Sequence, residues 1–263
     1  MTFFRRFLHI LWLAGCFHAL LLLCGCAGSM FHMKPLPEMT PETLLEKIGE
    51  HSGRLKTFQG KGVFTIASDA GAFRGEIRIV TRRPDSLWFK LEGPLGIDMV
   101  TARFAGGRFA FYSPWMKNVI RDSLSQMDFR RLLPAGLDSL DVLTGLLGMP
   151  ELKAGDLDSA RSVSRGKGHY VLNFGSSESL WVEPKGPVIT RWEKRDGEGK
   201  TVWLYEADLF RNSGDVRLPK RIRFTESETR EMVLYYEDIK VNLPLKRGWS
   251  DVHLPKGAET KTL

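Results

Sequence analysis

From Leu55 onward, apolar and polar residues alternate along the chain with a period of two. In AFRGEIRIV at 72–80, Phe73, Ile77 and Ile79 alternate with Arg74, Glu76 and Arg78. In SLWFKLE at 86–92, Leu87, Phe89 and Leu91 alternate with Trp88, Lys90 and Glu92. This alternation is typical of antiparallel strands that bury one face and expose the other. The pair Gly106-Gly107 fits the two-residue turn of a hairpin. The pattern predicts about six strands between residues 55 and 121.

Two segments have helical spacing instead. Thr40 is a candidate N-cap with Pro41 at the first helical position, and the apolar spacing that follows predicts a helix over 41–52. In SLSQMDFRRLLPAGLDSLDVLTGLLGMP at 123–150, leucines recur on one helical face. We therefore expect two further short helices there, joined at Pro134.

Strands resume at about His169 and continue to about residue 242, which brings the expected total to about twelve. A sheet of that many antiparallel strands curls, and closing it fully or partly into a barrel protects its edges. No linker divides this region. We predict a mainly β (α+β) fold in one domain over 41–263: a single curved antiparallel sheet that forms an incomplete barrel, with about three short helices as a lid.

The first 26 residues read MTFFRRFLHILWLAGCFHALLLLCGC, a basic start followed by an apolar run and small residues. This order is typical of a secretory signal peptide. LCGC at 23–26 resembles the bacterial lipobox, which predicts a lipoprotein signal peptide over 1–25, a lipidated Cys26 and a flexible tether over 26–40. The alternative is an uncleaved membrane anchor, because the apolar run approaches the length that spans a bilayer.

Removal of 1–25 lowers the formal net charge from +7 to +5, because Arg5 and Arg6 are lost with it. A moderately basic chain suits contact with anionic lipid headgroups. The basic residues are nevertheless scattered along the strands, as they are on an ordinary solvated surface, and we expect no nucleic-acid partner. Of the three cysteines only Cys26 would remain after cleavage, which leaves no disulfide framework.

The sequence lacks the common catalytic motifs. The histidines beyond the signal peptide, at 32, 51, 169 and 253, are isolated from one another, and none belongs to an HExxH pair. There is no GxSxG nucleophile elbow and no GxxxxGK[ST] phosphate loop. We therefore expect a protein that is not an enzyme and that needs no metal and no cofactor.

Apolar and aromatic side chains are in excess on alternate strand positions of the first six predicted strands. A sheet face lined in this way is either an ordinary core or, with few helices to cover it, the wall of an apolar cavity suited to acyl chains. The candidate lining residues are Phe64, Ile66, Phe73, Ile77, Ile79, Phe89, Leu91, Phe109 and Phe111.

The stretch from KGVFTIASDAGAFRGEIRIV to GGRFAFYS, followed by LDVLTGLLGMP, resembles the outer-membrane lipoprotein receptor LolB, a relative of the periplasmic carrier LolA. The likeness covers about residues 55–150, and GPLG at 93–96 is its most specific element. The tail VNLPLKRGWSDVHLPKGAE departs from LolB and is more similar to the ends of other proteins of the lipoprotein-carrier type.

This resemblance implies an incomplete barrel whose apolar cavity accepts the acyl chains of lipoproteins or lipids. It also implies a LolA-like carrier as partner, and a membrane-insertion loop formed by Gly93, Pro94, Leu95 and Gly96, with Leu95 entering the membrane. We expect a monomer held at the outer membrane by its lipid anchor, with its body facing the periplasm, that receives lipoproteins and inserts them. The alternative is a lipid-binding or structural envelope lipoprotein of the same fold without transfer activity.

Overall fold

The computed structural model describes residues 36–69, 71–115, 118–123, 145–150, 152, 162–166, 168–227, 230–250 and 259–261. They belong to one compact unit, Leu36–Leu263. The predicted signal peptide, the lipidation residue Cys26 and most of the tether lie outside the described residues. So does most of the segment 123–150, in which two helices are predicted.

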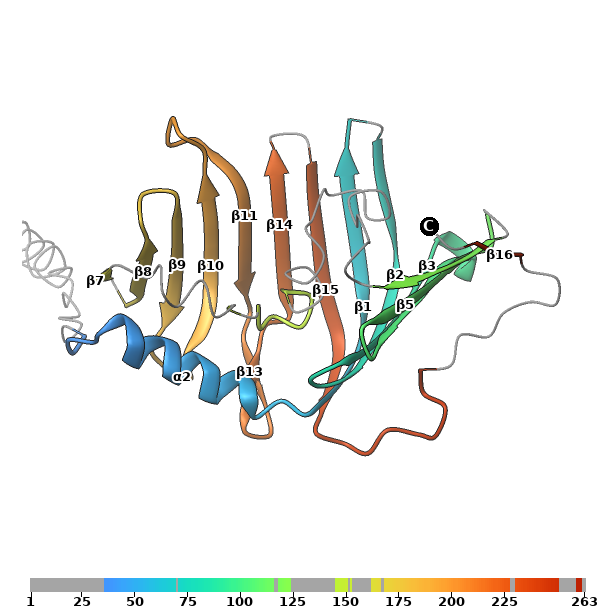
Figure 1. Ribbon diagram of the computed structural model, residues 1–263, viewed down its shortest axis with the longest axis horizontal. Coiled ribbons are helices and arrows are strands. Elements are labelled where there is room, and N and C mark those ends of the chain that lie inside the picture. The colour runs from blue at the N-terminus through green and yellow to red at the C-terminus, as the bar shows by residue number, and fades with distance from the viewer. Residues whose placement is uncertain are drawn as a thin grey trace, which may run out of the picture. The chain divides into compact units, whose positions relative to one another are not determined.

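One large sheet dominates the described chain (Figure 1). Its first strands are β1 (Thr57–Ser68), β2 (Gly71–Arg82), β3 (Ser86–Glu92), β4 (Asp98–Ala105), β5 (Arg108–Ser113) and β6 (Asn118–Ser123). The later strands are β7 (Ser162–Arg165), β8 (Tyr170–Phe174), β9 (Glu178–Glu183), β10 (Val188–Arg195), β11 (Thr201–Asp208), β14 (Arg221–Ser227), β15 (Arg230–Val241) and β16 (Glu259–Lys261). Strands β12 (Arg211–Ser213) and β13 (Val216–Leu218) form a separate hairpin.

The order across the sheet is β16-β6-β5-β4-β3-β2-β1-β15-β14-β11-β10-β9-β8-β7. Every neighbouring pair is antiparallel except β16, which runs parallel to β6. The mainly β fold and the six strands predicted over 55–121 are confirmed. The sheet is not closed into a barrel, because β16 and β7 end the order without pairing with each other.

The helix predicted over 41–52 is α2 (Pro41–Gly53). The Thr40 hydroxyl caps it by accepting a hydrogen bond from the Thr43 backbone N–H at 3.3 Å. The apolar stripe of Leu44, Leu45 and Ile48 is buried, and α2 contacts β10. In Figure 1 the helix lies along one end of the strands from β8 to β11. The predicted lid of about three helices is thus represented in the described residues by this one complete α-helix.

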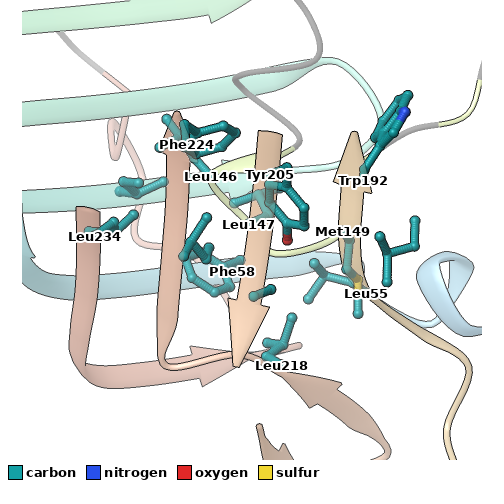
Figure 2. Packing of buried hydrophobic residues seen from close by; sticks show 14 of the residues in the cluster. Leu55, Phe58, Leu146, Leu147, Met149, Trp192, Tyr205, Leu218, Phe224 and Leu234 are labelled. Atoms are coloured by element: carbon teal, nitrogen blue, oxygen red, sulfur yellow. The ribbon is translucent and has the colours of Figure 1, made fainter. Parts of the chain in front are cut away.

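The core lies on one face of the sheet, which we call the inner face. It is lined by alternate residues of the strands, such as Phe58 of β1 and Phe224 of β14, both buried. The described residues of 145–150 pack against this face, and Figure 2 shows Leu146 and Leu147 beside Tyr205 of β11. Burial of so many apolar side chains on one face supplies the main favourable term in folding.

Candidate functional site: the inner face and the turn after β3

All nine predicted lining residues lie on the inner face. Six of them, Phe64, Ile77, Ile79, Phe89, Phe109 and Phe111, are buried, and Ile66, Phe73 and Leu91 are partly buried against the same cluster. Alternation places them there because successive side chains of a strand point to opposite faces. Whether they line an acyl cavity or only a core stays a prediction.

The strand register aligns these side chains into rows that cross the sheet. Ile79 pairs with Phe89 of the next strand, Phe89 pairs with Ala102, and Ala102 pairs with Phe111. Phe104 connects two of the predicted rings, with its centroid 6.1 Å from Phe89. Aromatic pairs at this separation contribute about 0.5–1.5 kcal/mol beyond their burial. The result is a continuous aromatic surface over β3, β4 and β5.

The second half of the sheet contributes a group of inner-face aromatics that was not among the predicted lining residues. Their rings form a row in which Trp192 contacts Trp203, Trp203 contacts Phe224, and Phe224 contacts Tyr205, with centroids between 5.3 and 6.4 Å apart. The alternation in TVWLYEADLF was the available signal, and it identified a strand. It could not show that this strand shares a face with β1 to β5, because that depends on pairing between distant segments.

The segment 145–150 is held on the inner face by one buried hydrogen bond. The Tyr236 hydroxyl donates to the Leu146 carbonyl oxygen at 2.7 Å. Gly148 adopts a left-handed backbone, and a Cβ there would lie 2.2 Å from Pro219, so only glycine fits. Burial raises the pKa of Tyr236 well above its ordinary value. A neutral hydroxyl is therefore the form that holds this segment.

Tyr205 lies in the same buried region, but its hydroxyl has no hydrogen-bond partner within the described residues. Burial raises its pKa as well. An unsatisfied buried hydroxyl costs about 1–3 kcal/mol. The inner face therefore has one polar atom that its described surroundings leave unsatisfied.

The predicted membrane-insertion loop is the turn between β3 and β4, where Pro94–Gly96 form a single 3-10 turn. The Leu95 side chain is 99% exposed, the highest value among the exposed large apolar residues of the described chain. Its backbone is left-handed, with φ 62° and ψ 20°. That conformation costs a residue with a Cβ about 1–2 kcal/mol. The fold therefore holds an apolar side chain in solvent at the expense of backbone strain.

Hydrogen bonds of the backbone close this turn. The Gly93 N–H donates to the Ile97 carbonyl oxygen at 2.8 Å, and the Gly96 N–H donates to the Gly93 carbonyl oxygen at 3.2 Å. Gly96 has a left-handed backbone with φ 72°, and the ring of Pro94 fixes the φ of Pro94 itself. Gly96 and Pro94 thus have a backbone reason for their identity.

The base of the turn is pinned by an ion-pair cluster on the outer face of the sheet. Lys90 Nζ lies 2.8 Å from Glu92 Oε1 and 2.6 Å from Asp98 Oδ1, so it bridges the last residue of β3 and the first of β4. Burial lowers the pKa of Lys90, but its hydrogen bonds to Asp98 and Glu92 outweigh that effect and raise the pKa. Lys90 therefore stays charged and holds the two strand ends together.

A surface groove of about 540 Å³ runs beside the turn. It is lined by Val63, Arg74, Gly75, Glu76, Arg78, Glu92, Gly93, Pro94, Leu95 and Gly96. Gly75 allows the end of β3 to approach β2, because a Cβ at this position would lie 2.3 Å from the Glu92 carbonyl oxygen. The groove thus joins charged residues of β2 to the exposed leucine.

The described residues offer neither a membrane-spanning helix nor a cluster of metal ligands. Among them no helix is long and apolar enough to cross a membrane. Nor do three or more His, Cys, Asp or Glu side chains gather there in a way that could hold a metal ion.

No protein-family model matches the sequence, and no curated protein matches it. Solved structures do resemble the fold. A LolA superfamily protein from Nitrosomonas europaea has a TM-score of 0.55 and 16% identity, over 81% of this chain and 99% of that one. The chain shares its fold with this protein.

Two other solved structures also resemble the fold of this chain. A DUF1329 family protein from Desulfovibrio piger has a TM-score of 0.60 at 11% identity, covering 80% of this chain and 96% of that chain. A protein from Vibrio parahaemolyticus described as an outer membrane lipoprotein-sorting domain has a TM-score of 0.56 at 11% identity, covering 79% and 96%. At such identities the likeness shows the fold alone. The comparisons therefore support the resemblance to LolB at the level of the fold.

Proposed function

We propose that this protein is a lipid-anchored envelope protein that accepts acyl chains on the inner face of its sheet and helps insert lipoproteins into the outer membrane. The observation that carries the proposal is Leu95, fully exposed at the tip of a turn whose backbone is strained to hold it there. A strained residue of this kind persists only where the surrounding structure determines it, and such residues cluster at functional sites.

The energetics suit reversible contact of this turn with a bilayer. Full burial of one leucine contributes about 1.5–3 kcal/mol. That is too little to hold a protein on a membrane and enough to bias how it docks. Permanent attachment would come from the predicted lipid on Cys26, since stable anchoring takes at least two membrane signals.

Acyl chains would move from carrier to protein to bilayer in order of increasing affinity. Each buried methylene contributes about 0.8 kcal/mol, so a difference of a few methylenes in buried length is sufficient to set the order. The aromatic rows of β3 to β5 would provide the apolar surface. No nucleotide hydrolysis is required, which agrees with the absence of catalytic motifs from the sequence.

The acceptance step can be tested with a photo-crosslinking side chain placed at one of two adjacent positions of β1. Ile66 is partly buried against the inner cluster, and Thr65 precedes it on the same strand and points to the outer face. We expect crosslinks to the acyl chains of a lipoprotein presented by a LolA-like carrier from position 66 and not from position 65. Equal crosslinking from both positions, or none from position 66, would contradict acceptance on the inner face.

A lipid-binding or structural protein of the same fold would give a different result. It would bind a free acyl chain or nothing, and it would take no lipoprotein from a carrier. The same crosslinking experiment, run with a free acyl chain in place of the carrier-bound client, separates these functions.

A further inference from the structure

A second large apolar side chain is exposed near the turn after β3. Strand β5 ends at Ser113, and Trp115, two residues further along the chain, is 72% exposed. Tryptophan is usually largely buried, because its indole has a large apolar surface. An indole held in solvent at a turn therefore needs a reason.

The sheet order places Trp115 at the same end of the strands as Leu95. Strands β3 and β5 run in the same direction with the antiparallel β4 between them, so the turns that follow them leave the sheet at the same end. Lys90 and Tyr112 both pair with Thr101, which sets the two strands level with each other. Neighbouring strands are about 4.8 Å apart, so the two turns begin about 10 Å apart.

Ile97 adds a third exposed apolar side chain to this edge, at 51% exposure on the turn after β3. Leu95, Ile97 and Trp115 are thus three of the large apolar residues exposed in the described chain, and they lie on two adjacent turns. Exposed apolar groups that gather in this way mark a contact surface.

Charge beside these turns favours a lipid surface as the partner. Arg74 lines the groove next to Leu95 and Gly96. Three other basic groups of the neighbouring outer face are paired: Lys61 with Glu76 at 3.2 Å, Arg78 with Glu92 at 3.4 Å, and Lys90 with Glu92 and Asp98. Arg74 forms no ion pair with any other described residue, so its guanidinium is available for an external anion such as a lipid phosphate.

We propose that Trp115 and Ile97 extend the Leu95 turn into a membrane-docking edge, which lies on the headgroup region of an anionic bilayer while Arg74 contacts lipid phosphate. This inference rests on the proposed membrane contact of Leu95. Tryptophan is enriched at membrane–water interfaces, where its apolar ring and its N–H both find partners. A basic group next to the surface adds attraction to anionic lipid.

The test uses the full chain reconstituted into vesicles of phosphatidylethanolamine and phosphatidylglycerol whose acyl chains carry bromine, a quencher of indole fluorescence. We expect a quenched component that is lost in Trp115→Phe and kept in Trp181→Phe. Trp181 is the matched control, since it lies on β9 beneath Arg191, away from both turns. Leu95→Glu should also reduce the quenching of Trp115, because it lifts the edge from the bilayer. Equal quenching in wild type and Trp115→Phe would overturn the proposal.

A second version of the experiment tests the role of lipid charge by replacing phosphatidylglycerol with phosphatidylcholine. We expect the quenching of Trp115 to fall in these neutral vesicles and to become independent of lipid charge in Arg74→Gln. Lys61→Gln is the control, because the side chain of Lys61 is already paired with Glu76. If quenching of Trp115 is the same on anionic and neutral vesicles in the wild type, the assignment of Arg74 is wrong.

The failure of this inference differs from the failure of the proposed function. If lipoprotein transfer proceeds while Trp115 is not quenched, the function stands and the docking edge is wrong. If Trp115 is quenched while no lipoprotein is accepted from a carrier, the edge binds membranes in a protein of another function. Circular dichroism of each variant checks folding, which the exposure of Trp115 predicts to be unaffected.

Discussion

The two ends of the strands are built in opposite ways. One end, which we call the helix end, holds α2 and the chain segments that follow β15, and its backbone groups are tied together by side chains. The Asn242 side chain accepts a hydrogen bond from the Lys56 N–H at 2.8 Å and donates one to the Arg54 carbonyl oxygen at 3.0 Å. The other end, the turn end, holds the turns after β3 and β5, where Leu95 and Trp115 are exposed.

This contrast distinguishes residues that stabilise the fold from residues that are available for contact with a membrane. At the helix end Phe58 is fully buried and the backbone groups of Arg54 and Lys56 are paired, as in a folded core, and the large apolar residues Leu209 and Leu243 are only about half exposed. At the turn end the same sheet leaves large apolar side chains in solvent and accepts a left-handed leucine. We therefore expect substitutions at the helix end to reduce the free energy of unfolding, and substitutions at the turn end to reduce membrane contact with little effect on stability.

The largest expected effect is that of Phe58→Ala at the start of β1. Phe58 is fully buried, with its ring centroid 5.4 Å from that of Tyr236. Removal of a buried phenylalanine costs about 3–5 kcal/mol of the free energy of unfolding. Urea denaturation measures this loss, with Leu95→Ala as the control expected to stay within about 0.5 kcal/mol of wild type. Similar losses in the two variants would remove the distinction between the ends.

A smaller loss is expected from Asn242→Ala. The change removes the three side-chain hydrogen bonds that connect residues 54, 56 and 57 to the end of β15, and it leaves alanine with the φ of 56° that Asn242 has. We expect a loss of about 2 kcal/mol in the same denaturation assay. Asn212→Ala, at an exposed position of β12, is the matched control and should change stability by less than about 0.5 kcal/mol. An Asn242→Ala variant with the same free energy of unfolding as the wild type would show that this side chain does not hold the helix end together.

Two buried tyrosines predict that the protein loses stability at alkaline pH. Tyr205 and Tyr236 both have raised pKa values in the folded state, whereas in the unfolded chain they lose their protons near pH 10. Their contribution is therefore fully present below about pH 10 and is lost as the pH rises, by up to about 1.4 kcal/mol per pH unit for each tyrosine. Urea titrations at a series of alkaline pH values measure the slope. Tyr205→Phe should reduce this slope by the contribution of one proton. An unchanged slope would contradict a raised pKa for Tyr205.

The same two tyrosines should respond differently when their hydroxyls are removed at neutral pH. Tyr236→Phe leaves the Leu146 carbonyl oxygen unpaired and should cost about 1 kcal/mol. Tyr205→Phe removes a hydroxyl without a partner in the described chain, so its cost should be close to zero, or stability should rise. Thermal unfolding of the two variants side by side is the measurement. Equal costs would indicate that Tyr205 is bonded.

The smallest expected effect has the opposite sign. Asparagine adopts the left-handed conformation more readily than leucine, so Leu95→Asn should raise the free energy of unfolding by about 0.5–1 kcal/mol. Thermal unfolding measures the change. The same variant should lose membrane contact, because its tip is polar. A variant that is less stable than wild type would show that the Leu95 side chain stabilises the fold.

The sequence was sufficient to predict local features. The period of two placed Ile77 and Phe89 on the same face, and Thr40 with Pro41 marked the start of α2. These features depend on neighbours along the chain, which a pattern records. Leu147 was predicted to lie on an apolar helical face, but its packing against the second half of the inner face could not be predicted.

Long-range pairing explains what the sequence could not show. The parallel contact of β16 with β6 joins residues far apart in the chain, as does the Tyr236 hydrogen bond to Leu146. Whether the sheet closes depends on whether its two edge strands, β16 and β7, pair with each other. No local sequence pattern identifies either of them as an edge strand. The exposure of Trp115 likewise depends on what packs against the turn after β5. For these reasons the strands that form the two edges of the sheet could not be identified from the sequence, and the second apolar turn was missed.

The central claim is that acceptance and delivery of an acylated protein are separate steps, the second of which depends on Leu95. The most direct measurement follows a labelled lipoprotein from its soluble carrier to residues 27–263 of this protein and then to liposomes, for wild type and Leu95→Glu. We predict that both proteins accept the client and that only the wild type delivers it. If the wild type accepts no acylated client, or if Leu95→Glu delivers as well as the wild type, the account is contradicted.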